Sequence, residues 1–252
     1  MDVMTYLARI GISAIPAPTA NDLARLQKAH LFSVPYENLD ILAGKPILLE
    51  TEALYEKIVL RHRGGYCFEL NELFGQLLRA LGYGVQDCFG RFLRGEKELP
   101  KRRHHVLIVT VPKTGERFLC DVGVGSGSPT LPMRLMVGET LRDGADTYRI
   151  RRDDFLGWVL EEPCEDGWRD VYSFTEEPQL PVDFLTTSYF CEHSPLSPFN
   201  KAPMVSLRTD FGRVTRDGDE FRRFTGDGVT VLTPPPQERD QLMAEWFGLE
   251  GY

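Results

Sequence analysis

The chain has 252 residues, of which 42% are hydrophobic and 26% are charged, so it is long enough to bury a sizeable core. Its net charge of −8 argues against nucleic acid as the main partner, because phosphate binding needs surplus positive charge. The sequence contains no apolar run near the ~18 residues of a membrane span, and its first ten residues do not have the pattern of a signal peptide.

The first 84 residues favour helices. One helix is expected over residues 19–32, after a capping segment that begins at Pro18, and a second over residues 50–62. The clearest helix begins near Cys67 and stops at the Gly-Tyr-Gly of residues 82–84. Its apolar side chains recur at three- and four-residue steps, at Leu70, Leu73, Phe74, Leu77, Leu78 and Leu81.

The middle third favours strands. Residues 105–112 and 117–122 form a predicted hairpin around the turn 113–116. Further strands are expected at residues 147–152, 157–160 and 168–174, followed by Pro-rich loops (178–203), strands at 205–207 and 229–232, and a terminal helix at 236–247. Helices followed by a run of strands indicate an α+β fold, with an antiparallel sheet or barrel in the middle.

Cys67 is the candidate nucleophile. Two glycines, Gly64 and Gly65, end a loop just before it, and it lies in the first turn of the amphipathic helix. Helix N-terminal amides favour an anion, so we expect a lowered thiol pKa. The alternative is a buried structural cysteine, which is the usual fate of a free thiol. Five scattered cysteines without a CxxC pair indicate reduced thiols, hence a cytoplasmic protein without a metal.

A cysteine nucleophile needs a base and a group that orients the base. Among five histidines, His104 and His105 stand at the start of a strand whose hairpin partner carries Asp121, a residue that needs a buried partner inside an apolar strand. A tight turn places Asp121 opposite Ile108, and strand alternation then favours His104 over His105. His104 would then lie four residues along the strand from Ile108, the residue opposite Asp121, a distance of roughly 13 Å. A register shift or bulge must close it, unless the histidines are ordinary surface residues.

One segment of this acidic chain is basic. Residues 91–103 hold six cationic side chains against Glu96 and Glu98, a net charge of +4. This is either a solvated loop or a binding surface for an anionic ligand such as a nucleotide phosphate.

Five ordered segments resemble the arylamine N-acetyltransferase family across nearly the whole chain. They are PYENLD (35–40), RGGYCFELN (63–71), RHHVLIV (103–109), DVGVG (121–125) and SPLSPF (194–199). The second segment matches the signature around the family's catalytic cysteine. The third and fourth match the stretches that carry the catalytic histidine and aspartate.

The resemblance implies a cysteine-protease- or transglutaminase-like core in three parts. These are a helical domain with the nucleophile (1–84), a β-barrel with the histidine and aspartate (85–188), and an α/β lid (189–252). It implies ping-pong transfer of an acyl group, most simply acetyl, from coenzyme A to an arylamine, arylhydrazine or related amine. The catalytic residues would be Cys67, His104 and Asp121.

The same resemblance implies supporting residues. The substrate and coenzyme A residues would be Val124, Gly125, Phe199, Arg102 and Arg103. An ion pair between Arg63 and Glu37 would brace the nucleophile loop. No membrane or nucleic acid partner is implied.

The chain departs from the family at Val124, where phenylalanine is usual, and it is shorter at its C-terminus than many members. Both features resemble the ansamycin amide synthases, in which an acyl carrier protein delivers the acyl group and the amine belongs to the same polyketide. A cysteine hydrolase and a non-catalytic binding module are the remaining alternatives.

Overall fold

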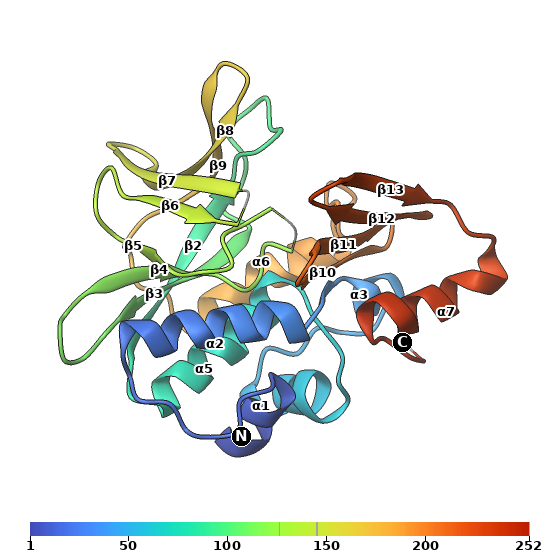
Figure 1. Ribbon diagram of the computed structural model, residues 1–252, viewed down its shortest axis with the longest axis horizontal. Coiled ribbons are helices and arrows are strands. Elements are labelled where there is room, and N and C mark those ends of the chain that lie inside the picture. The colour runs from blue at the N-terminus through green and yellow to red at the C-terminus, as the bar shows by residue number, and fades with distance from the viewer. Residues whose placement is uncertain (126, 145, 252) are drawn as a thin grey trace.

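The structure, a computed structural model, describes residues 1–125, 127–144 and 146–251, and its first part is helical (Figure 1). The elements are α1 (Val3–Arg9), α2 (Ala20–Ser33), α3 (Leu39–Leu42), α4 (Thr51–Leu54), a π-helical segment η1 (Tyr55–Leu60) and α5 (Cys67–Ala80). The helix expected at 19–32 is α2, and Thr19 caps it by accepting the Asp22 N–H at 3.1 Å. The helix expected at 50–62 divides into α4 and η1.

Helix α5 is the centre of the largest core cluster. The apolar residues that predicted it, from Leu70 to Leu78, are buried against α1, α2 and the first strands of the barrel. Because α5 is covered on most of its circumference, its first residue is held in the interior of the protein.

The second part is an eight-stranded antiparallel sheet that curls into a nearly closed barrel (Figure 1). Its strands are β2 (Gly84–Phe92), β3 (His104–Thr110), β4 (Arg117–Cys120), β5 (Met133–Arg134), β6 (Thr140–Asp143), β7 (Asp146–Asp153), β8 (Gly157–Cys164) and β9 (Gly167–Phe174). They run in the spatial order β5-β4-β3-β2-β9-β8-β7-β6. The expected strands are confirmed, and the fold is α+β.

The third part is a five-stranded antiparallel sheet in the order β1-β10-β11-β12-β13. Four strands come from the C-terminal region: β10 (Met204–Thr209), β11 (Gly212–Asp217), β12 (Glu220–Thr225) and β13 (Gly228–Leu232). The edge strand β1 (Tyr36–Glu37) comes from the N-terminal part. Helix α7 (Pro236–Phe247) packs Met243 and Phe247 against this sheet, which we call the lid sheet.

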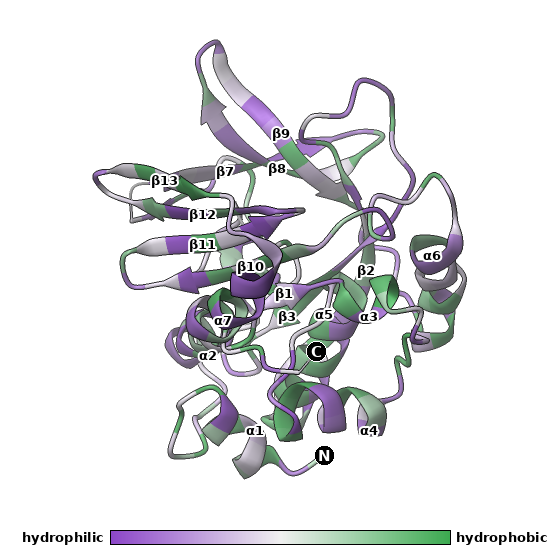
Figure 2. Cartoon of the chain, turned by 90° about the vertical axis from the view of Figure 1, so that its right-hand side faces the viewer, coloured by the Kyte–Doolittle hydropathy of each residue, from purple (hydrophilic) through white to green (hydrophobic). Residues whose placement is uncertain are grey.

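The expectation of loops over residues 178–203 is wrong, because helix α6 (Pro181–His193) occupies much of this segment. Pro181 opens the helix, where the missing N–H has no helical partner in any case. The domain boundary expected between residues 188 and 189 falls inside α6. In Figure 2, α6 lies on one side of the molecule and the lid sheet on the other, with α5 between them. Within the described residues, the helices are all too short or too polar to cross a bilayer.

Candidate active site

Cys67 is the first residue of α5, and the loop before it passes unusually close to its neighbours. A Cβ on Gly64 would lie 2.0 Å from the Pro35 carbonyl oxygen, and one on Gly65 would lie 2.9 Å from the Glu69 Cβ. Side chains at these positions would push the loop outward. The two glycines therefore fix the entry of the chain into α5 and with it the position of Cys67.

The β3–β4 hairpin brings Asp121 to His104 by a register that differs from the predicted one. Leu107 pairs with Cys120, and Val111 closes a four-residue turn by donating to the Glu116 carbonyl at 2.9 Å. The register differs by two residues from the expected one, so His104 and Asp121 still lie on the same side of the sheet. The distance between them along the strands falls from four residues to two. The predicted register is wrong, but the choice between the histidines is right: His104 Nε2 lies 2.6 Å from Asp121 Oδ2.

Asp121 is buried and held by three donors. Its Oδ1 accepts from Asn71 Nδ2 at 2.9 Å and from the Gly123 N–H at 2.8 Å, while Oδ2 faces His104. Burial alone would raise the pKa of Asp121, but the His104 imidazole and these hydrogen bonds hold that pKa below its usual value. Asp121 is therefore ionised, which places the imidazole proton on Nε2 and leaves Nδ1 as the basic nitrogen.

Asn71 is a site residue that sequence reasoning did not assign. Its Nδ2 also donates to the His105 carbonyl at 2.7 Å, and its Oδ1 accepts from the Val122 N–H at 2.9 Å. The available signal was its spacing, because a residue four positions after Cys67 lies on the same face of the helix. Asn71 joins the nucleophile helix to the strands that carry the imidazole and the carboxylate.

Gly123 permits a second close approach. A Cβ at this position would lie 2.6 Å from the Cys67 Cα and 2.7 Å from Asn71 Nδ2. The segment after Asp121 thus packs directly on the first turn of α5. Any larger residue would separate the carboxylate strand from the nucleophile helix.

The thiol of Cys67 is not ionised by its position alone. Burial raises the pKa of Cys67 well above its ordinary value, and the neighbouring Cys191 and Asp121 act in the same direction. The backbone N–H groups of His105 and Phe68 offset only part of this effect. The expected lowered pKa is therefore wrong, because removal from water outweighs the helix terminus.

The Cys67 thiol contacts the backbone next to the histidine. Its Sγ lies 3.8 Å from the carbonyl oxygen of Arg103, the residue before His104. Cys67 and His104 also line the same cavity, of about 420 Å³. The chemistry available here is proton transfer from sulfur to imidazole followed by nucleophilic attack.

The cavity is lined by aromatic and cationic side chains. Of the expected binding residues, Val124, Gly125, Phe199 and Arg103 line it. Arg102 does not: it pairs with Glu177 at 3.2 Å on the exterior. The aromatic lining residues are Tyr36, Phe92, Phe199 and Phe224.

The cations at the cavity come from two places in the chain. Arg94 and Arg103 belong to the basic segment, whereas Arg216 and Arg222 belong to the lid sheet. Four arginines and two acids, Glu96 and Asp217, line this wall. Arg94 also pairs with Glu162 at 2.6 Å and Arg103 with Glu96 at 2.5 Å, so an anionic ligand would compete with these carboxylates. Within the basic segment, Arg91 instead donates to the Pro100 carbonyl and Lys101 lies over the Phe190 ring.

Comparisons with known proteins decide the family. The family model described as N-acetyltransferase matches residues 19–250. The arylamine N-acetyltransferase of Mycolicibacterium smegmatis is 38% identical over 224 residues, which cover 86% of this chain and 80% of that protein. The chain belongs to the arylamine N-acetyltransferase family.

Solved structures of the family share this fold. The M. smegmatis arylamine N-acetyltransferase superposes with a TM-score of 0.93 at 33% identity, covering 99% of this chain and 93% of that one. The Mycobacterium marinum arylamine N-acetyltransferase in complex with CoA gives a TM-score of 0.91 at 33% identity, over 98% and 92% of the two chains. This is an acyltransferase family, so the hydrolase and the non-catalytic module are not retained.

The arylamine N-acetyltransferase fold here includes the expected ion pair behind the nucleophile loop. Arg63 contacts Glu37 Oε1 at 2.8 Å and Asp40 at 3.2 Å. Beside it, Lys57 bridges Asp40 and Glu69 at 2.8 and 2.7 Å. These buried and half-buried charges connect the segment around β1 with the loop and first turn of α5.

Proposed function

We propose that this chain transfers an acetyl group from acetyl-coenzyme A to the amino group of an arylamine, arylhydrazine or related amine, through an acyl thioester on Cys67. The observation that carries the proposal is the single cavity shared by Cys67 and His104, with Asp121 2.6 Å behind the imidazole. A relative solved in complex with CoA supports the donor.

In the first half-reaction, His104 Nδ1 takes the Cys67 proton as Sγ attacks the thioester carbonyl. The resulting tetrahedral adduct collapses, the C–S bond to coenzyme A breaks, and the imidazolium returns the proton to the leaving sulfur. Asp121 stabilises the imidazolium without taking its proton. The acetyl group then resides on Cys67.

In the second half-reaction, the amine nitrogen attacks the thioester on Cys67. His104 accepts a proton from the attacking nitrogen and gives it to the Cys67 sulfur, so an amide leaves and the thiol is restored. The aromatic side chains that line the cavity suit an arylamine ring, and the arginines that line it suit the phosphates of coenzyme A.

The binding roles follow the cavity. Val124, Gly125 and Phe199 are proposed to contact acceptor or donor, Arg103 to bind phosphate, and Arg102, on the exterior, is left out of this role. The carrier-protein donor of the amide-synthase alternative has no support among the relatives and is not proposed. A cytoplasmic location is supported by the cysteines, all five of which fall within the described residues and are free thiols.

Intact-mass measurement after mixing with acetyl-coenzyme A, without amine, tests the proposal. The protein should gain one acetyl group, Cys67→Ala should gain none, and an arylamine should discharge the group. Cys164→Ala, which changes a half-exposed thiol away from the cavity, is the matched control and should behave as the wild type. A wild type that gains no acetyl mass, or an acetylated Cys67→Ala, would contradict the proposal.

A further inference from the structure

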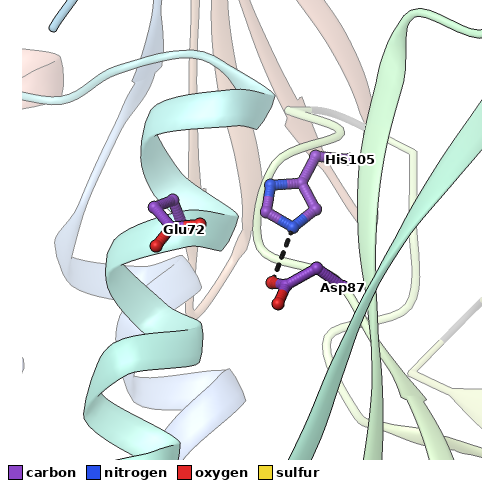
Figure 3. Close-up of side chains that lie close together, drawn as sticks. All are labelled: Glu72, Asp87 and His105. Atoms are coloured by element: carbon purple, nitrogen blue, oxygen red, sulfur yellow. Dashed lines mark hydrogen bonds and ion pairs between the residues drawn. The ribbon is translucent and has the colours of Figure 1, made fainter. Parts of the chain in front are cut away.

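The second histidine of the doublet makes a carboxylate pair of its own on the other face of β3. His105 Nε2 lies 3.0 Å from Asp87 Oδ1, and Asp87 also contacts Arg79 of α5. Burial alone would raise the pKa of Asp87, but the hydrogen bond and charge of His105, with the charge of Arg79, hold that pKa below its usual value. Asp87 is therefore ionised and Nε2 carries the proton. Figure 3 shows Asp87 and His105 meeting between α5 and the sheet, near Glu72.

These three residue types can also bind a divalent metal. Glu72, Asp87 and His105 are buried and offer ligand atoms within 4.8 Å of one another. However, Glu72 already accepts from Gln76 at 2.8 Å, and Asp87 already holds the Arg79 guanidinium. A metal would compete with these donors and lie beside the fixed positive charge of Arg79. The arrangement favours an anchor rather than a metal site.

His105 is anchored on several sides. Its ring stacks on Phe184 with centroids 4.2 Å apart and an interplanar angle of 25°, and its carbonyl accepts from Asn71 at 2.7 Å. Nδ1 has no hydrogen-bond partner among the described residues, so Asp87 is the polar anchor of the ring. Removing Asp87 would leave the ring held by stacking alone.

The Asp87–His105 contact connects the two elements that carry Cys67 and His104. Helix α5 carries Cys67 at its first residue and Arg79 in its last turn, while His105 directly follows His104 on β3. The chain of contacts Arg79–Asp87–His105 therefore fixes the strand of the base against the helix of the nucleophile. Arg79, Asp87 and His105 all lie outside the lining of the cavity.

We propose that the His105–Asp87 pair is a positioning pair, which holds His104 at the orientation that takes the Cys67 proton. For the reaction it serves, this inference rests on the proposed function. Because the pair does not line the cavity, its loss should slow the chemistry without weakening donor binding.

The test measures Cys67 reactivity in two ways. The first is alkylation by iodoacetamide as a function of pH, followed on the tryptic peptide 64–79, and the second is acetylation by acetyl-coenzyme A. His105→Phe keeps a ring on Phe184 but removes the polar anchor, and Asp87→Asn keeps the shape but removes the charge. In both variants we expect both rates to fall by about 10- to 100-fold, as a small misplacement does. The alkylation profile should move along the pH axis, while the acetyl-coenzyme A concentration that half-saturates the acetylation rate should stay unchanged.

His193→Phe is the matched control, because exposed His193, the last residue of α6, stacks on Tyr189 with the same 4.2 Å centroid distance and does not contact the pair. It should leave both rates unchanged. The alkylation and acetylation rates of the double variant His105→Phe/Asp87→Asn should be no lower than those of either single variant, since the two residues act as a unit.

Wild-type alkylation rates and profiles in folded Asp87→Asn and His105→Phe, whatever their melting temperatures, would overturn the inference. If His105→Phe does not fold, Asp87→Asn decides alone. A wild type that is alkylated but never acetylated would defeat the proposed function, while the alkylation arm would still test the positioning pair.

Discussion

At the scale of single residues, the reactivity of Cys67 depends on where its proton can go. Burial raises the pKa of the thiol, so in the proposed reaction the sulfur becomes a nucleophile only as His104 accepts the proton. The base is ready for this because ionised Asp121 fixes the proton of the imidazole on Nε2. Under the proposed function, the Asp121 carboxylate therefore controls the first step without contacting the acyl group.

Asp121→Asn should lower the rate of Cys67 acetylation by about 10³- to 10⁴-fold, because an amide can hold the wrong tautomer of His104. Rapid-quench mass spectrometry with acetyl-coenzyme A measures this rate. Asp170→Asn, which alters a half-exposed carboxylate paired with Arg151 in the barrel, is the control. Near-wild-type acetylation in Asp121→Asn would show that the carboxylate does not orient the base.

Val124→Phe should narrow the choice of acceptor. An added ring at a lining position reduces the space beside Cys67, so kcat/KM for bulky arylamines should fall by about tenfold more than for small ones. Val137→Phe, at an exposed site outside the cavity, should leave kcat/KM unchanged for both bulky and small arylamines. An equal effect on large and small amines would remove Val124 from the acceptor site.

The site residues that the sequence predicted are those whose partners lie close to them along the chain. Gly64, Gly65 and Cys67 share one loop-to-helix junction, and the doublet with Asp121 shares one hairpin. Asn71 and the lid arginines were missed because their partners come from distant segments. Arg216 and Arg222 lie on strands rich in charge, where position in the chain does not indicate which charges face the cavity.

At the scale of elements, periodicity predicted α5 because its apolar side chains recur at three- and four-residue steps, although polar residues between them are buried as well. Helix α6 was missed because it lies in a segment with several prolines. Residues 178–203 were expected to form Pro-rich loops, yet Pro181 stands in the first turn of α6, a position that tolerates proline. The hairpin strands were predicted, but their register depended on a four-residue turn that composition does not specify. Element type follows local pattern, while register follows backbone geometry.

His30 gives the helical part a dependence on pH. It is fully buried in α2 against the rings of Tyr6 and Phe74, and its two ring nitrogens find no hydrogen-bond partner within the described ranges. Burial lowers the pKa of His30 from 6.5 to about 3. Stability from the neutral ring is therefore complete above pH 6.5 and declines as the pH falls toward 3, because the unfolded chain gains the proton first.

His30→Leu should flatten this dependence. Between pH 6.5 and about 4.5, the wild type should lose roughly 2–3 kcal/mol more unfolding free energy than the variant. Urea unfolding across this range measures the difference, and His193→Leu, at an exposed site, should keep the wild-type slope. Parallel slopes for His30→Leu and wild type would mean that His30 is not kept neutral.

At the scale of the whole molecule, the buried side chain of Asn38 adds to strand β1 in joining the helical part to the chain that enters the lid sheet. Asn38 Nδ2 donates to the carbonyls of Phe199 and Ala202 at 2.7 and 2.9 Å, and its Oδ1 accepts from the Met204 N–H at 2.8 Å. The three-part division predicted from the resemblance did not include strand β1 in the lid sheet, because a two-residue strand has no periodicity to detect.

Asn38→Ala should lower the unfolding free energy by about 1–3 kcal/mol, since it leaves buried backbone groups unpaired. It should also raise the KM for acetyl-coenzyme A, because Phe199 and Met204 line the cavity. Asn21→Ala, at an exposed position of α2, is the control. An unchanged KM in a destabilised Asn38→Ala would separate the anchoring of the lid from the shape of the cavity.

Strand β1 also connects the lid sheet directly to the nucleophile loop. Tyr36 pairs with Ser206 of the lid sheet on one side and bridges to Gly65 on the other, where the Glu37 N–H donates to the Gly65 carbonyl at 2.8 Å. Gly65 is two residues before Cys67. A displacement of the lid sheet, which bears Arg216 and Arg222, would therefore be transmitted through β1 to the backbone that enters the first turn of α5. Binding of the phosphate end of a ligand at the lid sheet would thus be coupled to the position of Cys67, where the thioester would react.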